Sequence, residues 1–308
     1  MNSRKILLAA LFMAGIGSAS AQSNLLNAKT PDEIGKKTAE QMESDNDKPL
    51  PYGYVGDRDV LFSKMQWEVI DLNERVNFPL YFPIEDNLGE NRKSLFNVLV
   101  TAIKDTLLTE VYSDSYFRDK TTPENIQQVF YYKELNDLGL QVMNENMGQD
   151  EAKLKASGVL TAEHYTTSEL SAADISQYKI VGVWYFDKRQ GELKYRMLGI
   201  CPMGVDALTK LRQGSEAEPI ELFWVYFPAA RDVLHKAMAF NERNTSMPIT
   251  FDHLLNSRRF NGTIIKVDNV YGDRLIEDYM KDNAQMQLLE SERLKESIRN
   301  FEQDMWNY

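Results

Sequence analysis

The chain has 308 residues, and its 35 Lys and Arg stand against 46 Asp and Glu, which gives a formal net charge of −11. Proteins that follow nucleic-acid backbones neutralise phosphates with clustered basic side chains, so this acidic balance argues against nucleic-acid binding. The single cysteine, Cys201, excludes an intramolecular disulfide and a cysteine-rich zinc or iron–sulfur site. This length predicts one large domain or two smaller ones.

Residues 1–21 are typical of a secretory signal peptide. A basic start precedes an apolar run over residues 6–16, and Ala19-Ser20-Ala21 forms an A-x-A cleavage site. Cleavage there leaves Gln22 as the mature N-terminus. The alternative is a membrane anchor, but the run has only about half of the roughly 20 residues that a spanning helix needs. No later segment is long and apolar enough to span a bilayer, so we expect no direct membrane insertion.

Residues 22–56 are predicted to form a peripheral N-terminal arm. Thr30-Pro31-Asp32-Glu33 has the pattern of a helix start, with Thr as the N-cap and proline in the first turn. Residues 44–56 then show no periodicity. A disordered tail is the alternative interpretation.

The core is predicted over residues 57–280. Apolar residues at helical spacing predict helices over 58–78 and 92–112. Between them, the run Pro79-Leu80-Tyr81-Phe82-Pro83 predicts an extended crossing, because the residue before a proline avoids helical geometry. The pattern Thr121-Thr122-Pro123-Glu124 predicts the start of another helix.

Residues 136–176 are polar and weakly patterned, which predicts a sub-boundary or a long surface excursion. The period then changes to two. Alternation over 178–187 and 192–200, joined by a Lys-Arg-Gln-Gly turn, predicts a β-hairpin. Residues 221–227 predict a central strand, and 263–270 predict a further strand.

The last third returns to helical spacing. A helix is predicted over 229–241, Thr250 is predicted to cap a short one, and an amphipathic helix runs from Asp273, with residues 281–308 as a separate C-terminal element. Its stripe is not a clean heptad, so we expect it to lie on its own core or on a neighbour. The fold class is therefore α+β: a small, mainly antiparallel sheet packed with amphipathic helices, plus the peripheral arm and the long C-terminal helix.

No catalytic or metal-binding arrangement is evident, and we expect no cofactor. The three histidines, His164, His235 and His253, form no H-x-x-x-H pair. Cys201 follows an apolar strand end and precedes Pro202, which favours a buried, inert cysteine over a nucleophile. Aromatic residues make up 11% of the chain, and they anchor protein cores first and protein interfaces second. We therefore expect part of the surface to bind protein.

Three segments carry a pattern that composition does not explain. They are Asp59 to Lys64 with Trp67 to Leu72, Glu74 to Asn77 and Pro79 to Pro83; Trp184 to Lys188 with Arg196 to Pro202; and Leu222 to Pro228 with Thr250-Phe251-Asp252 and Asn269-Val270-Tyr271. In this order, over about residues 57–280, they resemble the gliding-motility protein GldN family, called PorN in non-gliding members, of the Bacteroidetes type IX secretion system.

The resemblance implies a structural rather than a catalytic protein, because the family has no known catalytic residues to transfer. It implies a periplasmic subunit that assembles with an outer-membrane lipoprotein, GldK or PorK, into a ring at the inner face of the outer membrane. That ring serves export of proteins with a type IX C-terminal signal and, in gliding species, adhesin movement. The periplasmic part of a proton-driven inner-membrane motor is the further expected partner.

A ring subunit needs two different faces, because head-to-tail contacts are what close a ring. We expect the arm and the C-terminal helix to form one such contact, through Tyr52, Tyr54, Met286, Ile298 and Phe301. The alternative is that both segments pack on their own core. Two other functions stay open: a periplasmic enzyme with an unrecognised site, around Cys201 or the acidic loops, and a small-ligand-binding protein with an apolar pocket.

Overall fold

The computed structural model describes residues 48–85, 93–146, 151–214, 217–240, 249–281 and 283–306. The chain divides into two compact units, one of residues 1–48 and 240–249 and one of residues 49–239 and 250–308. The second unit holds nearly all of the described residues. The predicted signal peptide, its cleavage residues Ala19, Ala21 and Gln22, and the helix start at Thr30 lie outside the described residues.

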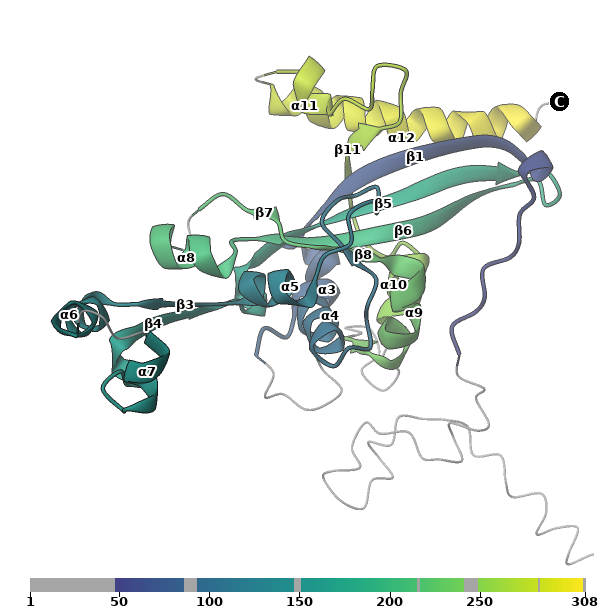
Figure 1. Ribbon diagram of the computed structural model, residues 1–308. Helices are drawn as coiled ribbons and strands as arrows, with labels where there is room; N and C mark the ends of the chain where they lie inside the picture. Colours follow the sequence, from purple (N-terminus) through teal and green to yellow (C-terminus); the bar gives the residue numbers. More distant parts are fainter. Residues whose placement is uncertain are drawn as a thin grey trace, which may run out of the picture. The chain divides into compact units, whose positions relative to one another are not determined.

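A seven-stranded sheet forms the centre of the second unit among the described residues (Figure 1). Its strands are β1 (Val60–Asp71), β2 (Val111–Tyr112), β5 (Ile175–Asp187), β6 (Glu192–Gly204), β7 (Ile220–Glu221), β8 (Trp224–Tyr226) and β11 (Thr263–Val267). The order is β11-β1-β5-β6-β8-β2, with β7 paired to β6 outside this path. Every pairing is antiparallel. The predicted α+β class with a mainly antiparallel sheet is therefore confirmed.

Strands β5 and β6 are the hairpin that the alternation predicts. They pair from Ile175 and Gly204 at the open end to Asp187 and Glu192 at the tip. The turn closes where Gly191 N donates to Asp187 O at 2.8 Å, and Gly191 takes a φ of 65°, which suits glycine. These two strands, of 13 residues each, are the longest in the sheet.

Strand β1 replaces the helix predicted over residues 58–78, and that prediction is wrong. Leu61 and Met65 fit helical spacing, but the strand instead buries Gln66 and Glu68 at alternate positions. Two buried polar side chains on a core face hide the period-two pattern of a strand. The whole strand pairs with β5, from Val60 to Asp71.

The helix α3 (Phe78–Tyr81) stands where an extended crossing was predicted, so that prediction is also wrong. Pro79 lies in the first turn of α3, where its missing N–H costs no intrahelical hydrogen bond. Asn77, just before it, is buried and exchanges two hydrogen bonds with the backbone of Asn261, at 2.9 and 3.1 Å. These bonds fix the corner between β1 and α3.

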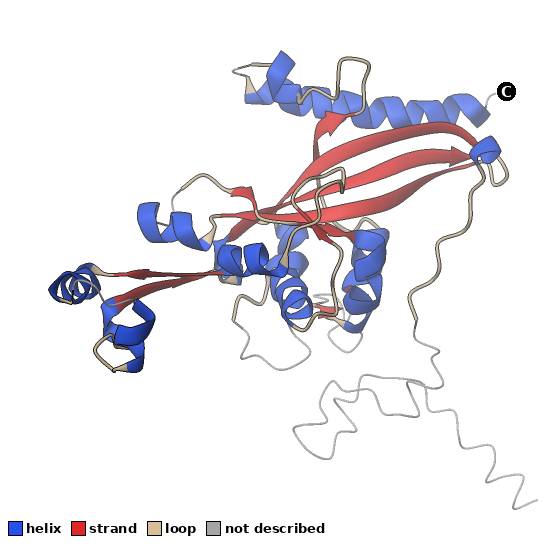
Figure 2. Cartoon of the chain, in the orientation of Figure 1, coloured by secondary structure: helices blue, strands red, loops and turns tan. Residues whose placement is uncertain are grey.

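Helices pack on both sides of the sheet (Figure 2). Figure 1 shows α3, α4 (Leu95–Lys104), α9 (Phe227–Lys236) and α10 (Phe251–Asn256) on one side, and α11 (Ile276–Tyr279) and α12 (Ala284–Trp306) on the other. Helix α4 is shorter than the predicted 92–112. It ends at Lys104, because Thr106 takes a left-handed φ of 56° and residues 111–112 join the sheet as β2.

Helix caps confirm two of the predicted starts. The Thr122 side chain accepts from Asn125 N at 3.4 Å at the start of α5 (Pro123–Phe130). The Thr250 side chain accepts from His253 N at 3.1 Å at the start of α10. The single strand predicted over 221–227 is wrong, since β7 and β8 pair with different parts of β6.

The polar stretch 136–176 forms most of an excursion from the sheet. Strands β3 (Tyr131–Leu135) and β4 (Tyr165–Glu169) pair with each other and carry α6 (Asp137–Glu145) and α7 (Glu151–Ala156) between them. Figure 2 shows this hairpin projecting beyond the sheet. Among the described residues, the remaining elements are α8 (Ala207–Gln213), β9 (Met238–Ala239), β10 (Ile249–Thr250) and short 3-10 turns at Asp57–Asp59, Arg75–Asn77, Ala162–His164 and Ala172–Asp174.

Candidate interaction surfaces

Residues 49–56, here called the strap, have no regular secondary structure. Tyr52 anchors them: its hydroxyl donates to Asn256 Oδ1 at 2.8 Å. The guanidinium carbons of Arg231 and Arg196 lie 4.3 and 4.9 Å from the centre of its ring. Burial raises the pKa of Tyr52 and outweighs the opposing effect of Arg231, so its hydroxyl stays protonated. Tyr52 therefore packs on its own chain.

A buried ion pair between Arg231 and Asp252 holds Asn256, the residue that accepts the hydrogen bond from Tyr52. Arg231 on α9 donates from Nε to Asp252 Oδ1 at 2.8 Å and from Nη2 to Asp252 Oδ2 at 3.2 Å. Asn256 Nδ2 donates to the same Asp252 Oδ1 at 2.7 Å, so the pair and the Tyr52 hydroxyl form one chain of hydrogen bonds. Bidentate Arg–carboxylate pairs are strong and directional, so they hold the anchor in one geometry.

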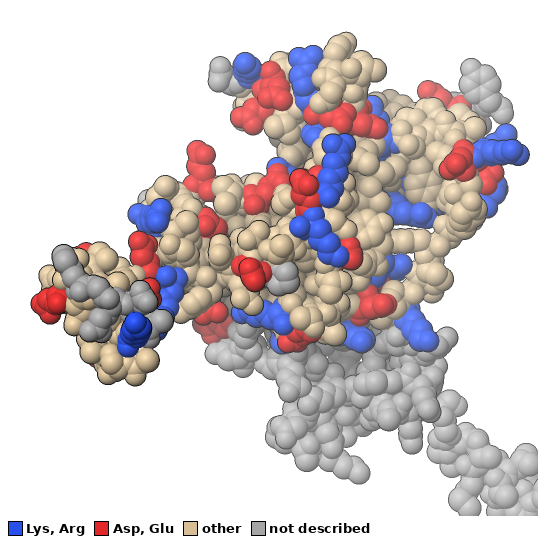
Figure 3. All heavy atoms as spheres, viewed as in Figure 1, with Lys and Arg blue, Asp and Glu red and all other residues tan. Residues whose placement is uncertain are grey.

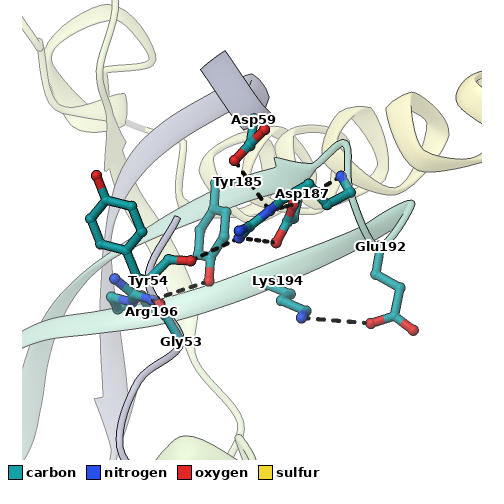
Figure 4. A network of polar contacts seen from close by, with 9 residues as sticks. Gly53, Tyr54, Asp59, Tyr185, Asp187, Glu192, Lys194 and Arg196 are labelled. Carbon is teal, nitrogen blue, oxygen red and sulfur yellow. Dashed lines mark hydrogen bonds and ion pairs between the residues drawn. The ribbon is translucent and has the colours of Figure 1, made fainter. Parts of the chain in front are cut away.

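Two arginines of the β5–β6 hairpin, Arg189 in its turn and Arg196 on β6, hold the strap backbone. Arg196 Nη2 donates to Gly53 O at 2.9 Å (Figure 4). Arg189 Nη2 donates to Tyr54 O at 2.7 Å. Arg189 also pairs with Asp187 and Asp59, and its hydrogen bond is the main cause of the lowered pKa of Asp187. The backbone at Tyr54 is thus fixed while its side chain is 85% exposed.

Helix α12 lies along the edge strand β11 with its inner face buried. The backbone N of Ile264 on β11 donates to the Ser291 hydroxyl at 2.8 Å, and Ser291 is fully buried. Ile298 is 5% exposed, and the Phe301 ring stacks on Phe62 with centroids 4.3 Å apart. The helix therefore covers an open sheet edge, which would otherwise offer unpaired backbone groups to other chains.

The first two turns of α12 present apolar side chains to solvent. Met286 is 46% exposed and Leu289 is 62% exposed. They lie three residues apart, so they share one face of the helix, and the helix stays uncharged from Ala284 to Leu289. A contiguous exposed apolar area of this kind marks an interaction site more often than scattered single residues do.

The start of α12 also borders a groove with a volume of about 420 Å³. Its walls come from β11, α11 and the start of α12, with Lys179 of β5. The lining residues are Lys179, Thr263, Ile264, Ile265, Leu275, Ile276, Glu277, Ala284, Gln287 and Leu288. Leu275 and Leu288 are themselves exposed, so the groove opens to the surface through apolar side chains.

The structure separates the five interface residues expected from sequence into two groups. Tyr52, Ile298 and Phe301 pack against their own chain, whereas Tyr54 and Met286 present their side chains to solvent. Sequence reasoning missed Leu288 and Leu289. The signal that could have found Leu289 is the uncharged stretch from Ala284 to Leu289, in which Met286 and Leu289 lie three residues apart.

The cysteine and the histidines, which were the candidates for catalysis or metal binding, make contacts within the fold. Cys201 is fully buried, as expected, and its thiol donates to Pro202 O at 3.4 Å. His164 Nδ1 accepts from Thr161 N at 3.0 Å at the end of a 3-10 turn. His235 Nδ1 lies 3.8 Å from Asp252 Oδ2, so it is more enclosed than a surface histidine. Within the described ranges, no group of three or more His, Cys, Asp or Glu is placed to hold a metal ion.

Charges are mixed over the visible surface. Figure 3 shows acidic and basic side chains interspersed on this face, with apolar and neutral side chains between them. In the part of the chain that the structure describes, no helix is long and apolar enough to cross a membrane.

The model of one protein family, described as gliding motility associated protein GldN, matches residues 55–307. The match begins at the end of the strap and includes the whole sheet, the groove and α12. No match is found among curated proteins.

Proposed function

This chain belongs to the GldN family of gliding-motility-associated proteins, and from that membership we propose that it is a structural subunit of the type IX secretion machinery. In this proposal the mature protein lies in the periplasm and forms a ring with an outer-membrane lipoprotein of the GldK/PorK type. The periplasmic part of the inner-membrane motor acts on that ring. The observation that carries the proposal is the match over residues 55–307.

The surface supports a role in assembly. Large apolar side chains are exposed at the strap, where Leu50 and Tyr54 lie, and again along residues 270–289. Burying apolar area is the main driving force of protein association, at about 25 cal/mol per Å². A subunit that contacts both a lipoprotein and further copies of itself needs more than one such area.

Membrane attachment comes through the partner in this proposal. The expected signal peptide would deliver the chain across the inner membrane, and no cysteine lies near its cleavage site to receive a lipid. A lipid-anchored partner supplies the attachment to the outer membrane instead.

Co-purification tests the proposal. An affinity-tagged chain is expressed in its native host from its own locus, and the periplasmic and outer-membrane fractions are solubilised with mild detergent. We expect the lipoprotein to co-purify in a stable ratio, and deletion of the gene to stop export of proteins with the type IX signal. Normal export in the deletion strain, or a chain recovered without the lipoprotein, would contradict the proposal.

A further inference from the structure

We propose that Tyr54 of one copy inserts into the groove between β11, α11 and α12 of the next copy. This contact rests on the proposed ring, and it assigns the head-to-tail interface to two surfaces of the described structure. The occupant of the groove is thus a second copy of this chain, bound through one tyrosine side chain and the strap around it.

Tyr54 is a pre-arranged aromatic side chain. Its carbonyl is held by Arg189 at 2.7 Å, and the preceding carbonyl is held by Arg196 at 2.9 Å, yet its ring is 85% exposed. Fixing the backbone before binding reduces the entropy that association costs. Tyrosine is also enriched among the residues that dominate binding energy at interfaces. Among the described residues, no contact of the Tyr54 ring compares with the hydrogen bond and ring contacts that anchor Tyr52.

The groove suits an aromatic side chain with a polar end. Its volume of about 420 Å³ is at the small end of the range of binding pockets, roughly 300–1,000 Å³. Leu275 and Leu288 provide apolar walls, while Thr263 and Glu277 provide oxygen atoms that can accept a hydrogen bond. A buried tyrosine hydroxyl needs such a partner.

The two surfaces lie at opposite ends of α12. The groove is lined by Ala284 and Leu288 at the start of the helix. Phe301, near its end, stacks on Phe62 and lies against Phe186, one residue before Asp187 at the hairpin tip that holds the strap. The helix has 23 residues, so the two ends are about 34 Å apart. Different surfaces at opposite ends give a heterologous contact, which forms a ring when the rotation between neighbouring copies closes.

Charge favours the same pairing. The hairpin tip, residues 185–196, has four basic and two acidic side chains, for a net +2. Including residues 53–59, with two acidic and one basic, leaves +1. The segment beside the groove, residues 268–281, has four acidic and two basic side chains, for a net −2. Opposite charges on the two faces steer the encounter and disfavour contact between like faces.

Cysteine cross-linking in the assembled complex tests the contact. The Tyr54→Cys/Leu288→Cys double variant is co-expressed with the lipoprotein, its large complex is isolated by mass, and it is mildly oxidised. We expect a ladder of dimers, trimers and higher species on a denaturing gel, because a head-to-tail contact links each copy to two others. Each single variant should stay monomeric. Leu50→Cys/Leu288→Cys, with an equally exposed strap residue, is the matched control and should cross-link far less.

A charge substitution gives an independent readout without oxidation. Tyr54→Asp should weaken self-association at least tenfold, while Leu107→Asp, at an exposed apolar residue outside both surfaces, should leave it unchanged. A large complex that forms normally in Tyr54→Asp and gives no ladder in the double-cysteine variant would overturn this contact and leave the proposed function standing. Failure of the wild-type chain to form any large complex would overturn both.

Discussion

Arg258 Nη2 contacts both carboxylate oxygens of Glu68, at 2.9 and 2.7 Å, and Glu68 is completely buried in the middle of β1. Gln66 donates a further hydrogen bond to the same carboxylate. The Arg258 guanidinium also lies 4.2 Å from the centre of the Tyr195 ring on β6. Removing one partner of a buried pair leaves an uncompensated charge, which is far more costly than losing a surface ion pair.

Replacing Arg258 with Ala should therefore lower the free energy of unfolding by about 3 kcal/mol, since the Glu68 charge is left without its partner. Arg258 has a left-handed φ of 51°, but alanine carries the same backbone penalty, so that effect cancels. Urea unfolding measures the change. Arg259→Ala, at the exposed neighbouring position, should change stability by less than about 0.5 kcal/mol. Equal effects of the two substitutions would show that the ion pair contributes little.

Ser291 offers a second matched comparison. In Ser291→Ala the backbone N–H of Ile264 loses its acceptor in a buried place, which should cost about 1–3 kcal/mol. Ser297→Ala is the control, because the exposed Ser297 hydroxyl donates only to Leu294 O within the same helix. Hydrogen exchange of the Ile264 amide should rise selectively in Ser291→Ala. Unchanged protection there would mean that α12 does not seal the edge of β11.

The pair Glu68–Arg258 also explains where sequence reasoning failed. Its two residues are 190 positions apart, so no local pattern shows that Glu68 can be buried. Leu61, Met65 and Val69 meanwhile lie four residues apart, which fits a helix, so the sequence predicts the wrong period for β1. By contrast, β5 and β6 alternate clearly around a glycine-containing turn, so the central hairpin could be predicted from local sequence alone.

The interaction surfaces were predictable only in part, for the same reason. Tyr52 and Tyr54 are two positions apart in the strap, yet one is anchored and the other is exposed. The difference comes from Arg231 and Asn256, which are distant in sequence. Likewise, the amphipathic pattern of α12 predicts a helix with one packed face. Only the contact between Ser291 and the edge strand β11 shows which face of the helix is buried.

The thiol of Cys201 should be unreactive in the folded protein. Burial raises the pKa of this thiol, so the thiolate that reacts with disulfide reagents is scarce near neutral pH. Its side chain is also fully enclosed by the sheet core. A chromogenic disulfide reagent should react with no thiol in the native chain and with one thiol per chain after unfolding. Fast reaction of Cys201 in the native chain would contradict this prediction and would favour a catalytic role for the thiol.

The ion pair between Asp174 and Lys210 should make stability depend on pH in the acid range. Burial raises the pKa of Asp174, but the hydrogen bond from Lys210 Nζ, at 2.7 Å, and those from Ser171 outweigh it, so the pKa lies below its ordinary value. The folded state therefore favours the carboxylate. Its contribution is complete above the ordinary pKa of 3.8 and is lost as pH falls further towards the folded-state pKa.

Unfolding of the Asp174→Asn variant measures this contribution. The variant should be less stable than wild type at neutral pH, and the gap should narrow as pH falls below about 4. Lys210→Met removes the partner and should show the same narrowing. A difference in unfolding free energy between variant and wild type that stays constant down to pH 3 would show that the Asp174–Lys210 pair does not cause the pH dependence.

The native mass of the mature chain, alone and co-expressed with the lipoprotein of its secretion locus, tests the central claim most directly. We predict a particle of many copies, in the megadalton range, that forms only when both proteins are present. A stable monomer that ignores the lipoprotein would contradict the proposal that this chain is a ring subunit.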